Sequence, residues 1–508
     1  MSVSSSPIGA KRGRLFGALA TVCALAVLSG IAVQGIASPD ESRVPWTGPV
    51  PKAHCRAGDH TESGLQGQTT LAERLGGAAA RGFNCNLELV GQFQGEGAFH
   101  AQAWTDVCSY YSTADSPLQA HPGVAVIDVS DPSAPKATAY LNAPSMLQTW
   151  ESLKVSEERK LIAAVESEGG SGVNPGFAVY DISDCRNPVL QAAIDLPVPK
   201  NTIKGHAGAI APDGRTYYGS YYPVSLYVID IADPTDPKLM LNWIPPGGVG
   251  APHDLSISDD GTRAYIMNPG TGASGKNGLV ILDVSDFQYR RPNPEPRVVS
   301  TLFWPDGGIA MTSQPIKIDG HPYLLASDEL GPTIVNHQSA CAQNLPPFGF
   351  PRLIDLADET EPKTVSLLKL EVDDPANCPQ MANDPALTGT FGYSAHYCRA
   401  DDPQDTRLVA CSRHEAGVRV FDVSNPYRPR EVAYYKPPIH PGANLPGSGI
   451  NTVANRTFDW SKSNSRFLTR NGVRELWITS ADNGFQVLRF TNRGHGQEGR
   501  SDGDRDRD

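Results

Sequence analysis

The stretch that decides the fold runs from His253 to Phe303 and contains four short β segments in succession. They read HDLSIS (253–258), TRAYIMN (262–268), LVILDV (279–284) and VVSTLF (298–303), and a DDG turn separates the first two. The segments have the composition of strands, and turn-forming residues lie between them. We therefore predict one four-stranded antiparallel sheet here.

The third of these segments recurs seven times along the chain. Each copy has a small or turn residue, alternating apolar residues, an aspartate, and then a polar turn that usually contains proline. The copies read GVAVIDVSDPSAP (123–135), GFAVYDISDCRNP (176–188), SLYVIDIADPTDP (225–237), GLVILDVSD (278–286), PRLIDLADETEP (351–362), GVRVFDVSNPYRP (417–429) and GFQVLRFTN (484–492). Six aspartates mark the units, namely Asp128, Asp181, Asp230, Asp283, Asp355 and Asp422, and Arg489 replaces the aspartate in the seventh.

The spacing of these units suits a β-propeller. It runs from 49 residues (Asp181 to Asp230) to 72 residues (Asp283 to Asp355), enough for a four-stranded sheet and its loops. The last copy ends at Phe490, whereas Leu87–Phe93 resembles a fourth strand with no unit of its own. We predict an all-β, seven-bladed propeller of four-stranded antiparallel blades, closed when this N-terminal strand pairs beside Gly484–Phe490.

The pattern strongly resembles the LVIVD-repeat family of bacterial exported proteins, on VIDVSDP (126–132) and VILDVSD (280–286). The resemblance covers about Leu87 to Phe490 and implies a propeller spanning residues 87–490. It implies little about function, because propellers carry many activities. The repeated aspartates are interpreted as acceptors of backbone N–H groups in the following turn, and not as catalytic residues.

The N-terminus has the layout of an export signal. A basic KRGR (11–14) precedes the apolar residues 15–37, and the small residues of GIA (35–37) offer a cleavage site. An uncleaved membrane anchor is the alternative. Residues 1–37 are thus a predicted signal peptide, 38–86 an extension packed outside the propeller, and 491–508 a disordered tail. The expected location is secreted or in the cell envelope, with membrane attachment only if the signal remains.

Cysteine usage agrees with an oxidising compartment. Eight cysteines remain after the signal, and no Cys-x-x-Cys pair occurs; they are Cys55, Cys85, Cys108, Cys185, Cys341, Cys378, Cys398 and Cys411. We expect disulfides, with Cys398 and Cys411 on neighbouring strands of the sixth blade. Cys55 and Cys85 are candidates for holding the N-terminal extension. The formal net charge of -12 disfavours nucleic acid as a partner.

Aligning the first strand of each repeat reveals a column of polar residues. Four repeats place a histidine at or just before this strand, namely His100, His206, His253 and His396. Glu151 and Gln314 hold the position in the second and fifth repeats, and Asn455 or Arg456 holds it in the seventh. Because first strands line the channel of a propeller, these side chains should converge on its axis, with at least three histidines sharing one ion.

Imidazole nitrogens bind iron, copper and zinc well. The column therefore predicts a transition-metal site held by the four histidines, with Glu151 as a fifth ligand, an orienting group or a proton-transfer group and hence the candidate catalytic residue. In the alternative interpretation each histidine only bonds the backbone where the chain enters its strand. Further polar residues follow the second strands, as a substrate rim or as solvated loop charges: Glu166, Glu168, Asp328, Glu329, His414, Glu415 and Asp482.

Two further resemblances concern this site. Residues 252–268 with LDVSD (282–286) are similar to a motif of the selenium-binding protein/methanethiol oxidase family, although the cysteine motifs of that family are lacking. Carotenoid-cleaving oxygenases are similar in architecture only, and hold iron with four axial histidines. Both imply oxidation at an axial metal. We expect either a metal-dependent oxidoreductase acting on a small molecule or a non-catalytic propeller that binds an envelope protein or polysaccharide.

Overall fold

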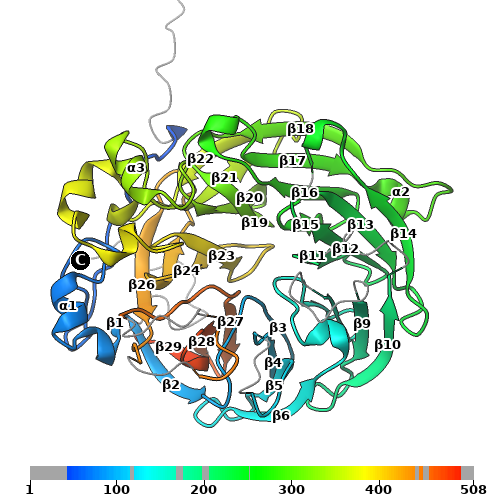
Figure 1. Cartoon of the computed structure of the whole chain (residues 1–508), viewed down its shortest axis with the longest axis horizontal. Helices are drawn as coiled ribbons and strands as arrows, with labels where there is room; N and C mark the ends of the chain where they lie inside the picture. Colours follow the sequence, from blue (N-terminus) through cyan, green and yellow to red (C-terminus); the bar gives the residue numbers. More distant parts are fainter. Residues whose placement is uncertain are drawn as a thin grey trace, which may run out of the picture. The chain divides into compact units, whose positions relative to one another are not determined.

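Seven β-sheets arranged around a centre form the body of the protein in the computed structural model (Figure 1). The structure describes residues 43–114, 119–166, 176–196, 205–250, 252–440, 445–449 and 457–492. The predicted signal peptide and residues 493–508 of the predicted tail lie outside these ranges. The seven-bladed, four-stranded antiparallel propeller that the sequence predicts is confirmed.

Each blade has a first strand nearest the centre, followed by three strands that step outward (Figure 1). The first three blades contain β3 (Gln102–Thr105), β4 (Cys108–Tyr111), β5 (Val124–Asp128) and β6 (Lys136–Leu141); β7 (Lys154–Ser156), β8 (Leu161–Val165), β9 (Gly176–Asp181) and β10 (Val189–Asp195); and β11 (Gly208–Ile210), β12 (Thr216–Tyr221), β13 (Ser225–Asp230) and β14 (Lys238–Trp243).

The next three blades follow the same order. They contain β15 (Leu255–Ile257), β16 (Arg263–Asn268), β17 (Gly278–Asp283) and β18 (Arg297–Phe303); β19 (Gly308–Ile318), β20 (His321–Leu330), β21 (Pro351–Asp355) and β22 (Lys363–Leu367); and β23 (Ala395–Ala400), β24 (Leu408–Arg413), β25 (Gly417–Asp422) and β26 (Arg430–Lys436). Among the described residues, three short α-helices occur: α1 (Leu71–Leu75) precedes the propeller, and α2 (Ser285–Gln288) and α3 (His337–Ala342) lie in connections within the fourth and fifth blades.

The seventh blade closes the ring with strands from both ends of the chain. It contains β27 (Arg466–Arg470), β28 (Val473–Ser480), β29 (Gly484–Phe490) and the N-terminal β2 (Leu87–Phe93). Strand β2 pairs antiparallel with β29, from Leu87 opposite Phe490 to Phe93 opposite Phe485. The predicted closure is therefore confirmed, and the outer edge of β29 is paired.

The repeated aspartate has the structural role that the sequence indicates. In all six cases its carboxylate accepts the backbone N–H two residues later, at 2.7–3.0 Å. A register shift between the third and fourth strands also recurs in every blade. Each repeat thus encodes a bulged outer strand pair and a fixed turn after the third strand.

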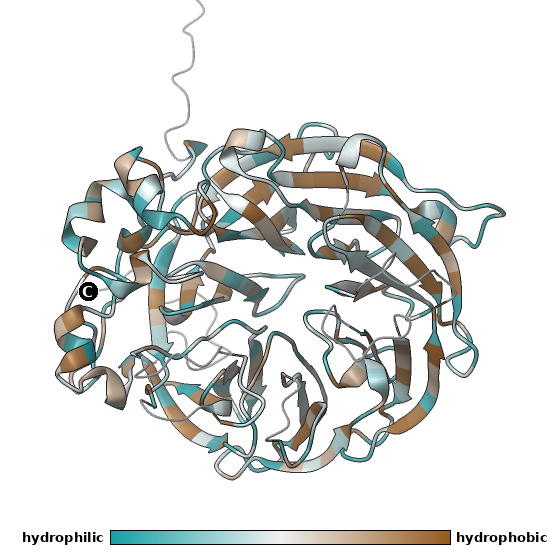
Figure 2. Cartoon of the chain, viewed as in Figure 1, coloured by the Kyte–Doolittle hydropathy of each residue, from teal (hydrophilic) through white to brown (hydrophobic). Residues whose placement is uncertain are grey.

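The hydrophobic core lies between adjacent blades. Val126 of the first blade and Ile162 of the second belong to one buried group, and Val228 and Val280 join the third blade to the fourth in another. Figure 2 shows the corresponding apolar stretches along the strands, with hydrophilic residues in many connecting loops. Polar side chains that point to the centre are therefore outside these apolar layers.

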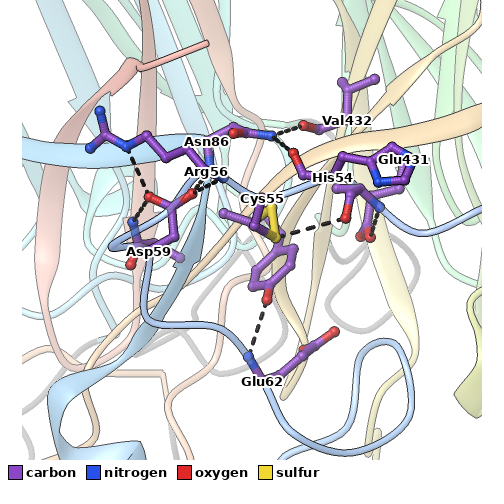
Figure 3. Close-up of a disulfide and its surroundings, with 12 residues drawn as sticks. His54, Cys55, Arg56, Asp59, Glu62, Asn86, Glu431 and Val432 are labelled. Atoms are coloured by element: carbon purple, nitrogen blue, oxygen red, sulfur yellow. Dashed lines mark hydrogen bonds and ion pairs between the residues drawn. A yellow bond between two sulfur atoms is a disulfide. The ribbon is translucent and has the colours of Figure 1, made fainter.

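The N-terminal extension packs against the sixth blade. Strand β1 (Phe83–Cys85) adds a fifth strand beside β26. Figure 3 shows the Cys55–Cys85 disulfide and the side chain of Asn86, which donates to the carbonyl oxygens of His54 and Val432, each at 2.9 Å. Buried Arg419 pairs with Glu62 of the extension at 2.6 Å. These contacts tie the extension to the propeller near the seam between the sixth and seventh blades.

The described cysteines form four disulfides, between Cys55 and Cys85, Cys108 and Cys185, Cys341 and Cys378, and Cys398 and Cys411. The predicted Cys398–Cys411 pair joins β23 to β24, with Cα atoms 4.0 Å apart. Four disulfides indicate an extracytoplasmic, oxidising environment. Within the described part of the chain, none of the helices has the length and apolar character that crossing a bilayer requires.

Candidate metal centre

The four predicted histidines lie at equivalent places in their blades. His100, His206 and His253 come shortly before β3, β11 and β15, and His396 lies in β23; all four are buried. Their backbones continue the first strand: the amides of His206 and His253 donate to Ser220 and Met267 of the second strands at 3.0 and 2.8 Å. These hydrogen bonds between the first and second strands thus fix the backbone positions of His206 and His253.

Six blades contribute side chains that meet at the centre. We call the following set the central cluster, in blade order: His100, Glu151, His206, His253, Glu329, and then His396 and His414 from the sixth blade. Side chains from opposite sides of a ring can contact one another only near its axis. The sequence predicts that the side chains of Glu151 and the four histidines converge on the axis, and these contacts agree with that position.

Glu151 lies in the middle of the predicted histidines. Its Oε1 atom is 3.1 Å from Nε2 of His396 and 3.5 Å from Nδ1 of His100, and its Oε2 atom is 3.4 Å from Nε2 of His206. Its backbone amide donates to the carbonyl of His206 at 2.9 Å. The second blade therefore delivers this carboxylate between its neighbours on either side.

The histidines divide into two pairs. Nε2 of His206 lies 3.0 Å from Nε2 of His253, and the rings of His100 and His396 have centroids 5.6 Å apart. Among described residues, the groups whose ligand atoms lie within 4.8 Å of one another are His100, Glu151 and His396; Glu151, His206 and His253; and Glu329, His396 and His414. The prediction that at least three of the four histidines share one ion is therefore not matched by these groups, since each holds two histidines and one glutamate.

Glu329 and His414 belong to the central cluster, although the sequence places them on a possible rim. Oε1 of Glu329 is 3.4 Å from Nε2 of His396, and Oε2 is 3.6 Å from Nε2 of His253. His414 packs against His396, with ring centroids 5.0 Å apart. Glu329 lies near the end of a second strand, and His414 directly follows one. The sequence shows polar residues at these places, but it does not show which second strands end beside the axis.

Gln314 does not take the fifth place in the ring. Its side chain lies in β19, where Oε1 accepts the amide of Ala400 at 2.9 Å, and Glu329 of β20 supplies the fifth blade's group instead. The candidates Asn455 and Arg456 lie outside the described residues. Shortly before β27 of the seventh blade, buried Lys462 lies beside the central cluster: its carbonyl oxygen faces Nδ1 of His396, and its Nζ is 4.8 Å from the ring centroid of Phe99.

The remaining rim candidates are buried, which corrects their interpretation as solvated loop charges. Glu166, Asp328, Glu415 and Asp482 all have little exposed surface. Asp328 accepts from Asn277, Trp304 and Arg352, and Glu415 pairs with Arg74 at 2.9 Å. These last two carboxylates are satisfied within the protein. Glu168 lies outside the described residues.

Several ligand atoms of the central cluster are buried without a hydrogen bond. They are Nδ1 of His100, Oε2 of Glu151, Nε2 of His396 and Nε2 of His414. In His396 and His414 the other ring nitrogen, Nδ1, faces a backbone carbonyl, of Lys462 and Ser394 respectively. In a neutral imidazole, an Nδ1–H that donates to a carbonyl leaves a lone pair on Nε2, which is the usual arrangement of a metal-binding histidine. Buried polar atoms without partners are costly, and a metal ion would satisfy them. The residues present fit such an ion.

The electrostatics of the central cluster keep Glu151 ionised. Burial by itself opposes its ionisation, but His206 and His396 hold its pKa well below the ordinary value. Burial also lowers the pKa of His396, yet the Glu151 and Glu329 carboxylates outweigh it and raise that pKa to about 9. Burial, reinforced by Lys462, lowers the pKa of His100 well below 6.5. A metal-free cluster thus holds an anionic Glu151 beside a cationic His396.

Aromatic side chains enclose the central cluster. His100 stacks on Trp150 with centroids 4.5 Å apart, and His414 stacks on Phe391 at 4.3 Å. Tyr222 lies 5.0 Å from His206 and 4.7 Å from His253. These rings restrict the rotamers of the imidazoles and lower the local polarity around them.

The fold and this site define a seven-bladed β-propeller with a buried histidine–glutamate cluster. Three segments match the model of the LVIVD repeat, at residues 120–139, 223–244 and 272–287, which fall in the first, third and fourth blades. The chain is an LVIVD-repeat β-propeller.

Other comparisons add little about function. No curated protein matches the sequence. Among solved structures, the chain is similar to a chain of Kuenenia stuttgartiensis hydrazine synthase, with 12% identity, a TM-score of 0.47, and coverage of 79% of this chain and 96% of that one. Likeness at this level carries no functional information. The function must therefore be argued from the central cluster.

Proposed function

We propose that this chain is an exported metalloprotein whose central cluster binds a transition-metal ion and supports an oxidation reaction on a small molecule. The observation that carries the proposal is the composition of the three ligand groups, each with two histidines and one glutamate. Two histidines and a carboxylate typically hold non-haem iron(II) and leave coordination positions open. Those positions can accept dioxygen and a substrate.

The residues of the chain have distinct roles in this proposal. The Lys462 carbonyl orients His396 through its Nδ1 atom, and the Ser394 carbonyl does so for His414 at 3.2 Å. Glu151 supplies negative charge at the buried centre, and this charge offsets the positive charge of a metal ion there. Buried Lys462, whose pKa burial lowers to about 7 against the opposing influence of Glu151 and Glu329, is a group that can hold or release a proton near neutral pH.

Export is the second part of the proposal. Four disulfides in the structure and the signal-like residues 1–37 of the sequence support it. The ligands of the proposed metal site are histidines and glutamates, and none of them is a thiol that an oxidising compartment would convert to a disulfide. The metal ligands therefore do not compete with disulfide formation.

Metal analysis of the purified protein tests the first part. Protein prepared without added metal, and protein stripped with a chelator and then supplied with iron(II), copper(II) or zinc(II), should contain bound metal by mass spectrometry. His253→Ala should lower that content, whereas His321→Ala should not, because His321 pairs with Asp355 on the fifth blade away from the centre. Absence of metal under all these conditions would overturn the proposal.

Open coordination is tested with nitric oxide. Iron(II) with two histidines, a carboxylate and open positions forms a nitrosyl adduct with a characteristic electron paramagnetic resonance spectrum. We expect this spectrum in the iron(II)-loaded protein. Bound iron without an adduct would show a closed, structural ion and would favour the non-catalytic binding propeller instead.

A further inference from the structure

We propose that the central cluster holds two metal ions, bridged by Glu151 and approached by Glu329 from the opposite side of the ring. This inference rests on the proposed metal-binding function and goes beyond it in the number of ions and the roles of the two glutamates. The juxtaposition that carries it is a pair of carboxylates, each with one oxygen toward His396 and the other toward the His206–His253 pair.

The order of the blades around the ring gives the two sites. The sixth and first blades supply His396 and His100, and the third and fourth supply His206 and His253. The second blade, with Glu151, stands between these pairs on one side of the ring. The fifth blade, with Glu329, stands between them on the other side. Around the ring, a histidine pair is therefore followed by a glutamate, then by the second histidine pair, and then by the second glutamate.

Glu151 bridges the two pairs through different oxygen atoms. Oε1 lies 3.1 Å from Nε2 of His396 and 3.5 Å from Nδ1 of His100, whereas Oε2 lies 3.4 Å from Nε2 of His206. Ligand atoms of one ion at about 2.0–2.2 Å lie roughly 3–4 Å from one another. Each oxygen is thus at the separation expected for a ligand of the ion on its own side.

Glu329 repeats this division from the opposite side of the ring. Its Oε1 lies 3.4 Å from Nε2 of His396, and its Oε2 lies 3.6 Å from Nε2 of His253. One ion would take His100, His396 and Oε1 of Glu151, whose ligand atoms lie within 4.8 Å of one another, and Glu329 and His414 form a further group of this kind with His396. The other would take His206, His253 and Oε2 of Glu151, which is the second such group that contains this glutamate, with Oε2 of Glu329 beside His253. Carboxylate bridges of this kind typically hold two ions about 3.5–4 Å apart.

A single ion accounts for less of the geometry. Among the residues that the structure describes, no group of ligand atoms within 4.8 Å combines a histidine of the first pair with one of the second. One ion would therefore leave the other histidine pair without a metal ion, together with one oxygen of Glu151. Nδ1 of His100 and Oε2 of Glu151, which lack hydrogen bonds, lie on opposite sides of this division.

The metal content of the full chain decides the number of ions. After removal of metal and reconstitution with manganese(II), iron(II), copper(II) or zinc(II), we expect about two ions per chain for the best-bound metal. A content of one ion would overturn the two-ion site while leaving the proposed metal-binding function standing. A content of zero with every metal would overturn both.

Variants on the two sides distinguish two sites from one. His100→Ala and His253→Ala should each reduce the content from two ions to about one, because each removes a ligand from only one site. Their far-ultraviolet circular dichroism should match that of wild type. His321→Ala, a histidine of the fifth blade paired with Asp355, should keep both ions. Complete loss of metal in both folded cluster variants would contradict the inference.

Magnetic coupling provides a readout that does not depend on folding of a variant. In wild-type protein loaded with copper(II) or manganese(II), two bridged ions should give a spin-coupled electron paramagnetic resonance spectrum. Substoichiometric loading should add the spectrum of an isolated ion. An isolated-ion spectrum at full loading would show that the ions are not bridged and would overturn the inference.

Discussion

Oε1 of Glu151 lies 3.1 Å from Nε2 of His396, although the two residues come from the second and sixth blades. This contact crosses the ring and joins the two histidine pairs into one charged unit. It follows that replacing the glutamate should change the titration of a histidine that is remote in the sequence.

Glu151→Gln should lower the pKa of His396 in the metal-free protein. The wild-type value is about 9, because Glu151 and Glu329 outweigh the effect of burial. Removing one carboxylate leaves the effect of burial less opposed, so the pKa of His396 should fall. Nuclear magnetic resonance of labelled histidine measures it. Glu88→Gln, at a half-exposed site of β2, should leave the value unchanged, and equal titration in the two variants would contradict the assignment.

The stability of the metal-free protein should depend on pH through His396. Its folded-state pKa of about 9 lies above the ordinary 6.5. A raised histidine pKa stabilises the folded state fully below about pH 6.5, and this contribution is lost as the pH rises through 9. The difference in unfolding free energy between wild type and His396→Gln should therefore shrink between pH 6.5 and 9. Urea unfolding with metal chelated provides the measurement, and a difference that grows with pH would refute the prediction.

Closure of the ring should depend on the buried side of β2. Leu87 is fully buried beside Leu488 and Leu476 of the seventh blade, whereas Leu89 of the same strand is 39% exposed. Leu87→Ala should cost about 2–5 kcal/mol of unfolding free energy, and Leu89→Ala much less. Denaturant unfolding compares the two. Similar costs would indicate that the strand contributes little core.

The turn aspartates should stabilise the fold through their acceptor oxygen. Asp181 accepts the amide of Ser183 at 2.7 Å. Asp181→Ala should cost about 1 kcal/mol, because it removes this bond, and Asp181→Asn should cost less, because an amide oxygen can replace the carboxylate. The urea midpoints of the two variants give the comparison. Equal losses would assign the effect to charge instead.

The disulfides should differ in their effect on stability. Cys108–Cys185 closes 77 residues and links the first blade to the second, whereas Cys398–Cys411 closes 13 residues within one blade. Loop entropy predicts losses of about 4.5 and 3 kcal/mol when the respective pairs are replaced by alanine. Thermal unfolding of the two double variants tests the order. A larger loss of stability for the shorter loop would show that loop entropy does not determine the order of the two losses.

The repeats made the fold predictable, because their periodicity acts locally. Each aspartate and its turn form within a few residues, and strand alternation is read directly from the sequence. The unpaired Leu87–Phe93 strand and the short last repeat together predicted the closure. The Cys398–Cys411 pair followed from two neighbouring strands.

The site was only partly predictable. The four histidines and Glu151 share one position in the repeat, so alignment places them at the same level of the channel. Gln314 shares that position as well, yet its side chain accepts a hydrogen bond from the amide of Ala400 in β23 of the next blade. Glu329 and His414 come from second strands, and sequence alone could not distinguish them from Asp328 and Glu415, which are satisfied by Arg352 and Arg74.

The sequence by itself determined the number of blades, the closing strand and the column of first-strand histidines, since these depend on local strand and turn propensities repeated along the chain. Only the tertiary structure decided that the histidines form two pairs and that Glu151 and Glu329 lie between them. The physical reason is that rotamers at the axis are set by packing across the ring. Contacts such as that of His100 with Trp150 join residues whose proximity no local pattern specifies.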